Sequence, residues 1–153
     1  MKKYRTMKKY RSEGPEETKD IGYRLGMLLK PGDVVGLYGE LGAGKTTMVK
    51  GIARAFGIGE REVTSASFTI ISEYETNPPF AHIDLYRIED ASDFSEIGLW
   101  DQLGGEGVSV IEWPEKAGGL LPGDMIKVMV KSINDSLREI TIEGIDEKNR
   151  NNL

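Results

Sequence analysis

The sequence predicts an α/β fold, a three-layer sandwich around a central mixed sheet that continues into an antiparallel C-terminal hairpin. Two observations predict it. A short apolar run at 34–38 leads directly into a glycine-rich loop at 39–46, and the residues that follow to position 56 place their apolar side chains on one helical face. Two β-rich segments, 125–131 and 137–142, are joined by the turn-forming sequence Asn-Asp-Ser. A strand, a phosphate loop and a helix in succession are typical of P-loop NTPase-like folds.

The first eleven residues form a basic segment that we expect to be partly disordered and to lead into a first strand. They carry six lysines and arginines and no acid, and the sequence Lys-Lys-Tyr-Arg occurs twice, with Met7 between the copies. Translation beginning at Met7 would leave the first six residues as a dispensable extension. Contact with RNA is the alternative interpretation. Since the whole chain has a net charge of −5, the chain without these six cations carries −11, which argues against broad nucleic-acid binding by its body.

A first helix is expected to begin at Pro15, because proline is favoured in the first helical turn and the two acids that follow it lie near the positive end of the helix dipole. Its apolar stripe consists of Ile21, Leu25, Leu28 and Leu29. Gly22 and Gly26 would let another element pack closely against this helix. The sequence Lys-Pro-Gly-Asp at 30–33 then predicts a turn into the strand at 34–38.

The loop has the complete phosphate-loop pattern G-x-x-x-x-G-K-[ST], and we expect it to bind ATP and Mg²⁺. Its backbone N–H groups lead into a helix N-terminus and form an anion site, and its glycines let the backbone approach phosphate oxygens. Lys45 would reach the β- and γ-phosphates, and the hydroxyl of Thr46 would bind Mg²⁺. The nucleotide-binding residues expected in this segment are Gly39, Glu40, Leu41, Gly42, Ala43, Gly44, Lys45, Thr46 and Thr47.

Two acids, Asp84 and Glu112, end apolar strand-like runs within 81–87 and at 108–112. In an open α/β sheet the carboxyl ends of the strands line the edge where the phosphate loop lies. Phosphoryl transfer to water needs an acid that holds hydrated Mg²⁺ and a group that orients the attacking water. We therefore predict that Asp84 belongs to the metal shell and that Glu112 activates water, with Glu112 also counted beside Thr46 and Asp84 among the residues around the metal. A solvated strand-end carboxylate is the alternative for either acid.

Three further features each have two interpretations. The hydroxyl side chains that precede a β-rich run at 70–74 suit either a segment that senses the γ-phosphate or a polar turn, and they are Thr64, Ser65, Ser67 and Thr69. His82 is more often a satisfied strand histidine than a catalyst. Trp113 is a core aromatic by default, and a platform for adenine if the end of its strand faces the base. A short helical segment is expected over 91–103.

Length and composition restrict the remaining possibilities. With 153 residues, 39% hydrophobic and 29% charged, we expect one P-loop ATPase domain over 12–145, preceded by the basic segment 1–11 and followed by a polar tail over 146–153. The absence of cysteine excludes thiolate metal sites, and a single histidine excludes a histidine-rich one. No apolar run approaches the roughly 20 residues of a membrane span. The expected location is the cytoplasm, with no membrane partner.

Four motifs occur in order along the chain: Gly-Glu-Leu-Gly-Ala-Gly-Lys-Thr-Thr at 39–47, Thr-Ser-Ala-Ser-Phe-Thr at 64–69, His-Ile-Asp-Leu-Tyr-Arg at 82–87 and Ile-Glu-Trp-Pro-Glu at 111–115. Together they resemble the TsaE (YjeE) family of small bacterial ATPases. The resemblance implies a role in threonylcarbamoylation of the adenosine beside the anticodon of tRNA. It also implies a TsaB–TsaD heterodimer as partner, with tRNA contacted indirectly through that complex.

For individual residues, the resemblance implies that Lys45 and Thr46 bind nucleotide and Mg²⁺ and that Asp84 serves the metal. It further implies that Glu112 supports hydrolysis and that Trp113 lies near the nucleotide. The chain departs from the family at position 66, where alanine replaces the proline of the usual Ser-Pro-Thr sequence. Without that proline the free loop is less restricted.

Other functional classes fit the sequence less well. A P-loop small-molecule kinase, the main alternative, needs an acceptor pocket and a closing lid, and the sequence has no arginine-rich lid insertion. A GTPase would need the guanine-reading sequence Asn-Lys-x-Asp, which is absent, and the DxxG-like sequence at 101–104 follows no clear strand. A non-catalytic scaffold would not need the phosphate-loop lysine and threonine together with both strand-end acids.

Overall fold

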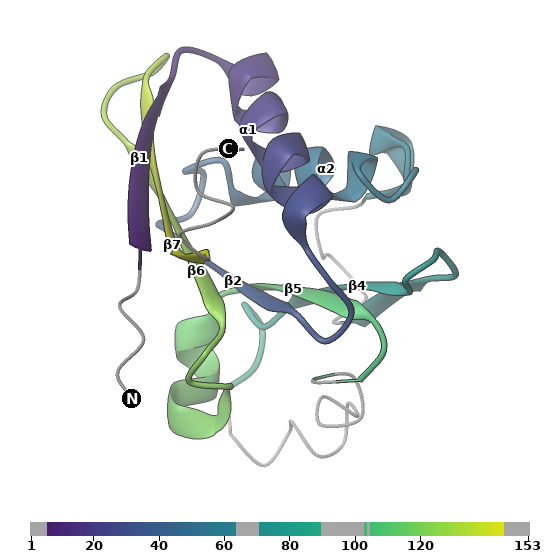
Figure 1. The fold of residues 1–153 in the computed structure, drawn as a ribbon. Helices are drawn as coiled ribbons and strands as arrows, with labels where there is room; N and C mark the ends of the chain where they lie inside the picture. The colour runs from purple at the N-terminus through teal and green to yellow at the C-terminus, as the bar shows by residue number, and fades with distance from the viewer. Residues whose placement is uncertain (1–5, 64–70, 90–102, 104, 146–153) are drawn as a thin grey trace.

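The computed structural model describes residues 6–63, 71–89, 103 and 105–145. Over these residues the chain forms a seven-stranded sheet with helices on both faces (Figure 1). The α-helices are α1 (Pro15–Leu28) and α2 (Lys45–Arg54), and two short 3-10 helices are η1 (Glu60–Glu62) and η2 (Pro114–Leu120). The strands are β1 (Thr6–Ser12), β2 (Val34–Tyr38), β3 (Ile71–Tyr74), β4 (Phe80–Asp84), β5 (Val108–Glu112), β6 (Ile126–Ser132) and β7 (Arg138–Ile145).

The sheet is mixed, with the strand order β1-β7-β6-β2-β5-β4-β3. Its centre is parallel, because β2 pairs in parallel with β5 on one side and β6 on the other, and β4 pairs in parallel with β5. Both edges are antiparallel, through the pairs β1–β7, β6–β7 and β3–β4. The expected α/β sandwich with a mixed sheet and an antiparallel C-terminal hairpin is confirmed, and β2, which leads into the phosphate loop, lies in the middle of the sheet.

Helices α1 and α2 lie side by side over one face of the sheet (Figure 1). Their backbones approach closely at glycines, as expected for Gly22. A Cβ atom added there would lie 2.7 Å from the carbonyl oxygen of Met48, and one added at Gly51 would overlap the backbone of Lys19. A side chain at either position would therefore push the two helices apart.

The two faces of the sheet carry separate apolar clusters. Alternation along β2 directs Val35 and Leu37 to the main core under α1 and α2, whereas Val34 joins the smaller cluster on the face of η2. The smaller cluster also contains Ile83 and Ile111 from the neighbouring parallel strands. Both faces of the sheet are covered at its centre. The carboxyl ends of the parallel strands β2, β4 and β5 therefore lie in fixed positions at the same end of the sheet, where the phosphate loop begins.

The structure adds detail to three sequence-based expectations. Residues 6–11 of the basic segment belong to strand β1, which pairs with β7 from Thr6 to Ser12. Strand β4 ends at Asp84; the N–H of Leu85 still bonds to the carbonyl of Glu112, and a turn follows in which the N–H of Ile88 bonds to the carbonyl of Leu85. The expected hydroxyl cluster at 64–69, most of the helical segment at 91–103 and the polar tail at 146–153 lie outside the described residues. Among the helices that the structure describes, none is long and apolar enough to cross a membrane.

Candidate nucleotide-binding site

The phosphate loop runs from the end of β2 to the start of α2 and lies against β6. Gly39 has φ 149°, and a Cβ atom at this position would overlap the carbonyl oxygen of Val130 in β6. Gly44, which precedes the first residue of α2, has φ 110° and accepts a hydrogen bond from the backbone N–H of Met48 (3.0 Å). Glycine is required at these two positions, because one leaves no room for a side chain and the other has a left-handed backbone. The loop therefore ends at the N-terminus of a ten-residue helix.

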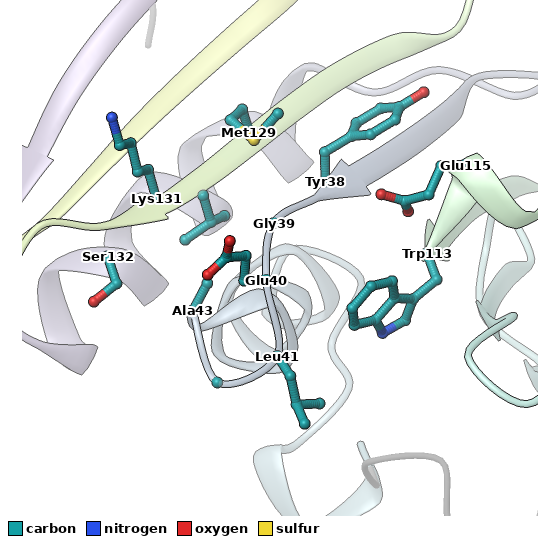
Figure 2. A pocket seen from close by; sticks show the side chains of 12 residues that line it. Tyr38, Gly39, Glu40, Leu41, Ala43, Trp113, Glu115, Met129, Lys131 and Ser132 are labelled. Carbon is teal, nitrogen blue, oxygen red and sulfur yellow. The ribbon is translucent and has the colours of Figure 1, made fainter.

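A pocket of about 840 Å³ opens beside the loop (Figure 2). Its volume is in the range of small-molecule sites. In Figure 2 the side chains of Trp113 and Glu115 lie on one side of the loop, and those of Met129, Lys131 and Ser132 lie on the other. The expected binding residues that line the pocket are Gly39, Glu40, Leu41, Gly42, Ala43 and Trp113. The remaining ones, from Gly44 to Thr47, form the adjoining turn into α2.

Lys45 is buried and has two contacts in the site. Its Nζ atom donates a hydrogen bond to the carbonyl oxygen of Gly39 (2.6 Å) and lies 3.3 Å from the centroid of the Trp113 ring. Burial lowers the pKa of Lys45, while the nearby carboxylates of Glu112, Glu115 and Asp84 act in the opposite direction. A further negative group would stabilise the charged form of this lysine, and the phosphate groups of a nucleotide provide one.

Trp113 is partly buried: it packs against the smaller apolar cluster and also lines the pocket beside the loop. Its backbone is left-handed at φ 59°, and it is the one such non-glycine residue among those the structure describes. Its ring packs on Tyr86, with 5.1 Å between the ring centroids, and on the ammonium group of Lys45. An uncommon backbone conformation of this kind often marks a functional position.

Glu112 joins the phosphate loop to strand β4. It is 3% exposed, and its Oε1 atom accepts a hydrogen bond from the hydroxyl of Thr46 (3.1 Å). Its Oε2 atom lies 2.6 Å from Nε2 of His82, a side chain that is equally buried. Three elements thus meet at one carboxylate: α2 through Thr46, β5 through Glu112 and β4 through His82. This contact of His82 was not predicted, because it runs diagonally between two strands whose pairing no motif reveals.

Asp84 lies next to Glu112 at the ends of two parallel strands, where the two residues are register partners. Its Oδ1 atom accepts a hydrogen bond from the backbone N–H of Tyr86 (2.9 Å). Burial raises the pKa of Asp84, and the charge of Glu112 raises it further, against the opposing effects of the Tyr86 N–H, His82 and Lys45. The structure therefore brings both predicted acids to the edge of the sheet where the loop begins.

The donor set at this edge suits a hard cation. Thr46, Asp84 and Glu112 all offer oxygen atoms, which Mg²⁺ prefers. In the described part of the chain, no group of three or more histidine, cysteine, aspartate or glutamate side chains forms a metal cage. Three oxygen donors leave coordination positions for other ligands, and Mg²⁺ is commonly shared with nucleotide phosphates.

Several residues around the pocket were not found by sequence reasoning. Met129, Lys131 and Ser132 come from the end of β6, which is next to β2 because Tyr38 and Met129 are register partners. No motif in the sequence reveals this neighbour, since the hairpin signal predicts that β6 pairs with β7 and not which strand lies on its other side. Arg87, which follows Asp84 in the sequence, is exposed.

Comparison with known proteins identifies similar chains along most of the sequence. The family model described as "Threonylcarbamoyl adenosine biosynthesis protein TsaE" matches residues 12–140. The protein called "tRNA threonylcarbamoyladenosine biosynthesis protein TsaE" in Bacillus subtilis (strain 168) is 42% identical over 141 residues, which are 92% of this chain and 87% of the relative. The protein of that name in Treponema pallidum (strain Nichols) is 40% identical over 131 residues, or 86% and 96% of the two chains.

A solved structure is similar as well. The crystal structure of Bacillus subtilis YdiB matches with a TM-score of 0.75 and 35% sequence identity. The match covers 99% of this chain and 94% of that one, and it supports the α/β fold described above.

Proposed function

This chain belongs to the TsaE family, which acts in the biosynthesis of threonylcarbamoyladenosine in tRNA, and we propose that its own activity there is Mg²⁺-dependent hydrolysis of ATP. The observation that carries the proposal is the connected set of contacts from the phosphate loop to the acids of the neighbouring strands. Lys45 lies at the start of the loop helix, Thr46 follows it, and the Thr46 hydroxyl is bonded to Glu112. The loop proposed to bind phosphate and a buried acid are thus close enough to share a metal ion, which supports metal-assisted phosphoryl transfer.

The loop would bind the triphosphate through its backbone N–H groups and Lys45. In the present arrangement Lys45 donates to the carbonyl of Gly39, a neutral acceptor. Phosphate oxygens are charged acceptors and make stronger hydrogen bonds with an ammonium group. ATP would therefore draw Lys45 away from Gly39, and its phosphate charge would oppose the lowering effect of burial on the pKa of Lys45.

Thr46, Glu112 and Asp84 would hold Mg²⁺ together with the phosphates. When bound, Mg²⁺ would neutralise negative charge that develops on the phosphate oxygens. Glu112 would also orient the attacking water. An ionised carboxylate offers about four lone-pair positions, so the bonds from Thr46 and His82 leave room for a water at the same group.

The two acids are distinguished by substitution with their amides. Glu112→Gln keeps an oxygen for Thr46, so we expect it to retain Mg²⁺·ATP and to lose most of its turnover, on the order of a hundredfold. Asp84→Asn should mainly raise the Mg²⁺ concentration needed for half-maximal hydrolysis. Phosphate release measured against Mg²⁺ concentration separates the two effects, and wild-type turnover in Glu112→Gln would contradict the water-orienting role.

The experiment that tests the proposed activity compares the wild-type chain with Lys45→Ala. Removal of the ammonium group should weaken ATP binding by about 3 kcal/mol, roughly a hundredfold in affinity, because charge-assisted bonds to the phosphates are lost. Titration with a fluorescent ATP analogue measures this. Lys50→Ala, on the same helix, is the matched control and should bind as the wild type does. Equal affinity of the folded Lys45→Ala variant and the wild type would remove the phosphate-loop assignment.

We further propose that hydrolysis drives the cycling of a TsaB–TsaD-type heterodimer, with tRNA contacted through that complex. Efficient transfer to water usually needs a positively charged group at the γ-phosphate, worth about 10³ to 10⁵ in rate. Two cations contact the described loop, Lys45 at the carbonyl of Gly39 and Arg138 at the carbonyl of Ala43, and both contacts are to backbone oxygens; Arg87 is exposed. A partner that completes or rearranges the site would couple ATP turnover to assembly, so we expect slow hydrolysis by the purified chain and stimulation by the heterodimer.

A further inference from the structure

We infer that Arg138 is a positioning residue for the phosphate loop, which it holds from outside the nucleotide pocket. It sets the direction in which the peptide group between Ala43 and Gly44 presents its N–H to a bound phosphate. The inference rests on the nucleotide site proposed above and assigns to that site a residue of the β6–β7 hairpin, far from every motif in the sequence.

Arg138 is the first residue of β7 and is partly buried. Its Nε atom donates a hydrogen bond to the carbonyl oxygen of Ala43, with 2.9 Å between the two atoms. Its Nη1 atom donates to the carbonyl oxygens of Asn134 (2.7 Å) and Leu137 (3.2 Å). One guanidinium group therefore bridges the turn of the hairpin and the backbone of the phosphate loop.

The hairpin turn that carries this arginine is itself held by several hydrogen bonds. The side-chain Oδ1 atom of Asn134 accepts hydrogen bonds from the backbone N–H groups of Ser136 (3.0 Å) and Leu137 (2.9 Å). The N–H of Ile133 donates to the carbonyl of Leu137 (2.9 Å) and closes the same turn. The planar, forked guanidinium is thus held by the turn on one side, which orders it for the bond to Ala43 on the other.

The bond to Ala43 has a consequence on the opposite side of the peptide group. The peptide between Ala43 and Gly44 is trans, as are all described peptide bonds except Asn77–Pro78. In a trans peptide the C=O and N–H bonds point in opposite directions. Since the Ala43 carbonyl is directed to the hairpin, the N–H of Gly44 is directed away from it, toward the side where the loop would receive phosphate oxygens.

The neighbouring peptide groups are held by bonds from the N–H of Ala43 to the carbonyl of Glu40 and from the N–H of Met48 to the carbonyl of Gly44, whereas the bond from Arg138 engages the peptide group between Ala43 and Gly44 itself. Gly44 has φ 110° and ψ 20°, and glycine can rotate between positive and negative φ with little steric penalty. A rotated peptide group would present the carbonyl oxygen to the phosphate in place of the N–H, and two oxygens would repel each other. The positive charge at the carbonyl also polarises the peptide group and strengthens its N–H as a donor.

The test is calorimetric titration of ADP and ATP, with Mg²⁺, into the full chain and three variants. Arg138→Met keeps the length of the side chain and loses all its donors. We expect the affinity for both nucleotides to fall on the order of tenfold, the size of one charge-assisted bond. Arg138→Lys keeps one donor and should lose less. Turnover at saturating ATP should stay within about twofold of the wild type, because Arg138 contacts neither Lys45 nor Glu112.

Arg24→Met is the matched control, since Arg24 is exposed on α1 and its Nε also donates to a backbone carbonyl, that of Asp20. It should bind nucleotides as the wild type does. Wild-type affinity in both Arg138 variants overturns the inference, as does a loss of turnover with unchanged affinity. If Arg138→Met fails to fold, Arg138→Lys decides, and wild-type affinity there overturns the inference. A wild-type chain that binds neither nucleotide would instead overturn the proposed function itself.

Discussion

Glu112 shows how a single residue joins the strands to the loop. Its two carboxylate oxygens are bonded to different elements, one to Thr46 at the start of α2 and the other to His82 in β4. At 3% exposure the carboxylate has little access to bulk water, so the two bonds replace its hydration. Removal of one partner of a buried charged group leaves a desolvated oxygen and a freer rotamer. His82 is therefore expected to act on the reaction through Glu112.

This role of His82 predicts a difference between two substitutions. His82→Leu removes the donor, and we expect it to lower kcat on the order of tenfold while ATP affinity stays within about twofold. His82→Gln has an amide that can donate to the same oxygen, so it should retain more of the wild-type kcat. Steady-state phosphate release together with nucleotide titration checks both values. If the two variants lost affinity and stability equally, with kcat unchanged, His82 would be only a core residue.

Much of the site could be predicted from the residues themselves. The phosphate-loop pattern identifies Lys45 and Thr46, and apolar runs that end in acids identify Asp84 and Glu112. The contact of His82 with Glu112 could not be predicted, because it depends on β4 being the neighbour of β5. The assignment of Asp84 to the metal and of Glu112 to water stays a prediction.

At the scale of elements, the edge strand β1 connects the N-terminal segment to the rest of the fold. The register of β1 with β7 shifts between Thr6 and Met7 and is regular from Met7 to Ser12. Within this part, Tyr10 packs against the main core, and the buried hydroxyl of Ser12 is bonded to that of Thr18 in α1 (2.7 Å). The anchoring contacts that the structure describes for this strand thus lie on the C-terminal side of Met7.

We therefore expect a chain that begins at Met7 to fold and to hydrolyse ATP as the full chain does. A chain that begins at Glu13 would lose β1 entirely, with the packing of Tyr10 and the bond of Ser12. It should unfold several degrees lower, since about 1 kcal/mol shifts the midpoint of a domain of this size by roughly 2 to 4 °C or more. Thermal unfolding followed by circular dichroism compares the three chains. A large loss of stability in the chain that begins at Met7 would show that the first six residues pack.

The positions of most helices and strands could be predicted from the sequence, but the order of the strands in the sheet could not. Apolar periodicity, the glycine-rich loop and the turn at 133–137 predict the helices and the hairpin close to where they occur. Periodicity indicates which residues face a core but not which strands become neighbours. For that reason the placement of β6 beside β2, which brings Lys131 and Ser132 to the pocket and Arg138 to the loop, became visible only in the fold.

At the scale of the whole molecule, the sheet collects the functional groups at one edge. The loop, both acids and the end of β6 come from four strands of the central sheet, and the covered faces keep those strands in fixed positions. The edge itself stays open beside a pocket of about 840 Å³. An open site of this kind would be accessible to a partner, as the proposed ATPase cycle needs. The family then identifies the process as threonylcarbamoyladenosine formation in tRNA.

The number of modified tRNA molecules formed per TsaB–TsaD heterodimer tests this account most directly. It is measured with the wild-type chain, with Glu112→Gln, and without the chain, each with ATP. The wild-type chain is also measured with an ATP analogue that cannot be hydrolysed. We predict many modified tRNAs per heterodimer only with the wild-type chain and hydrolysable ATP, and about one or fewer in the other reactions. Equal multiple turnover in all of them would contradict a role for ATP hydrolysis by this chain in the cycle.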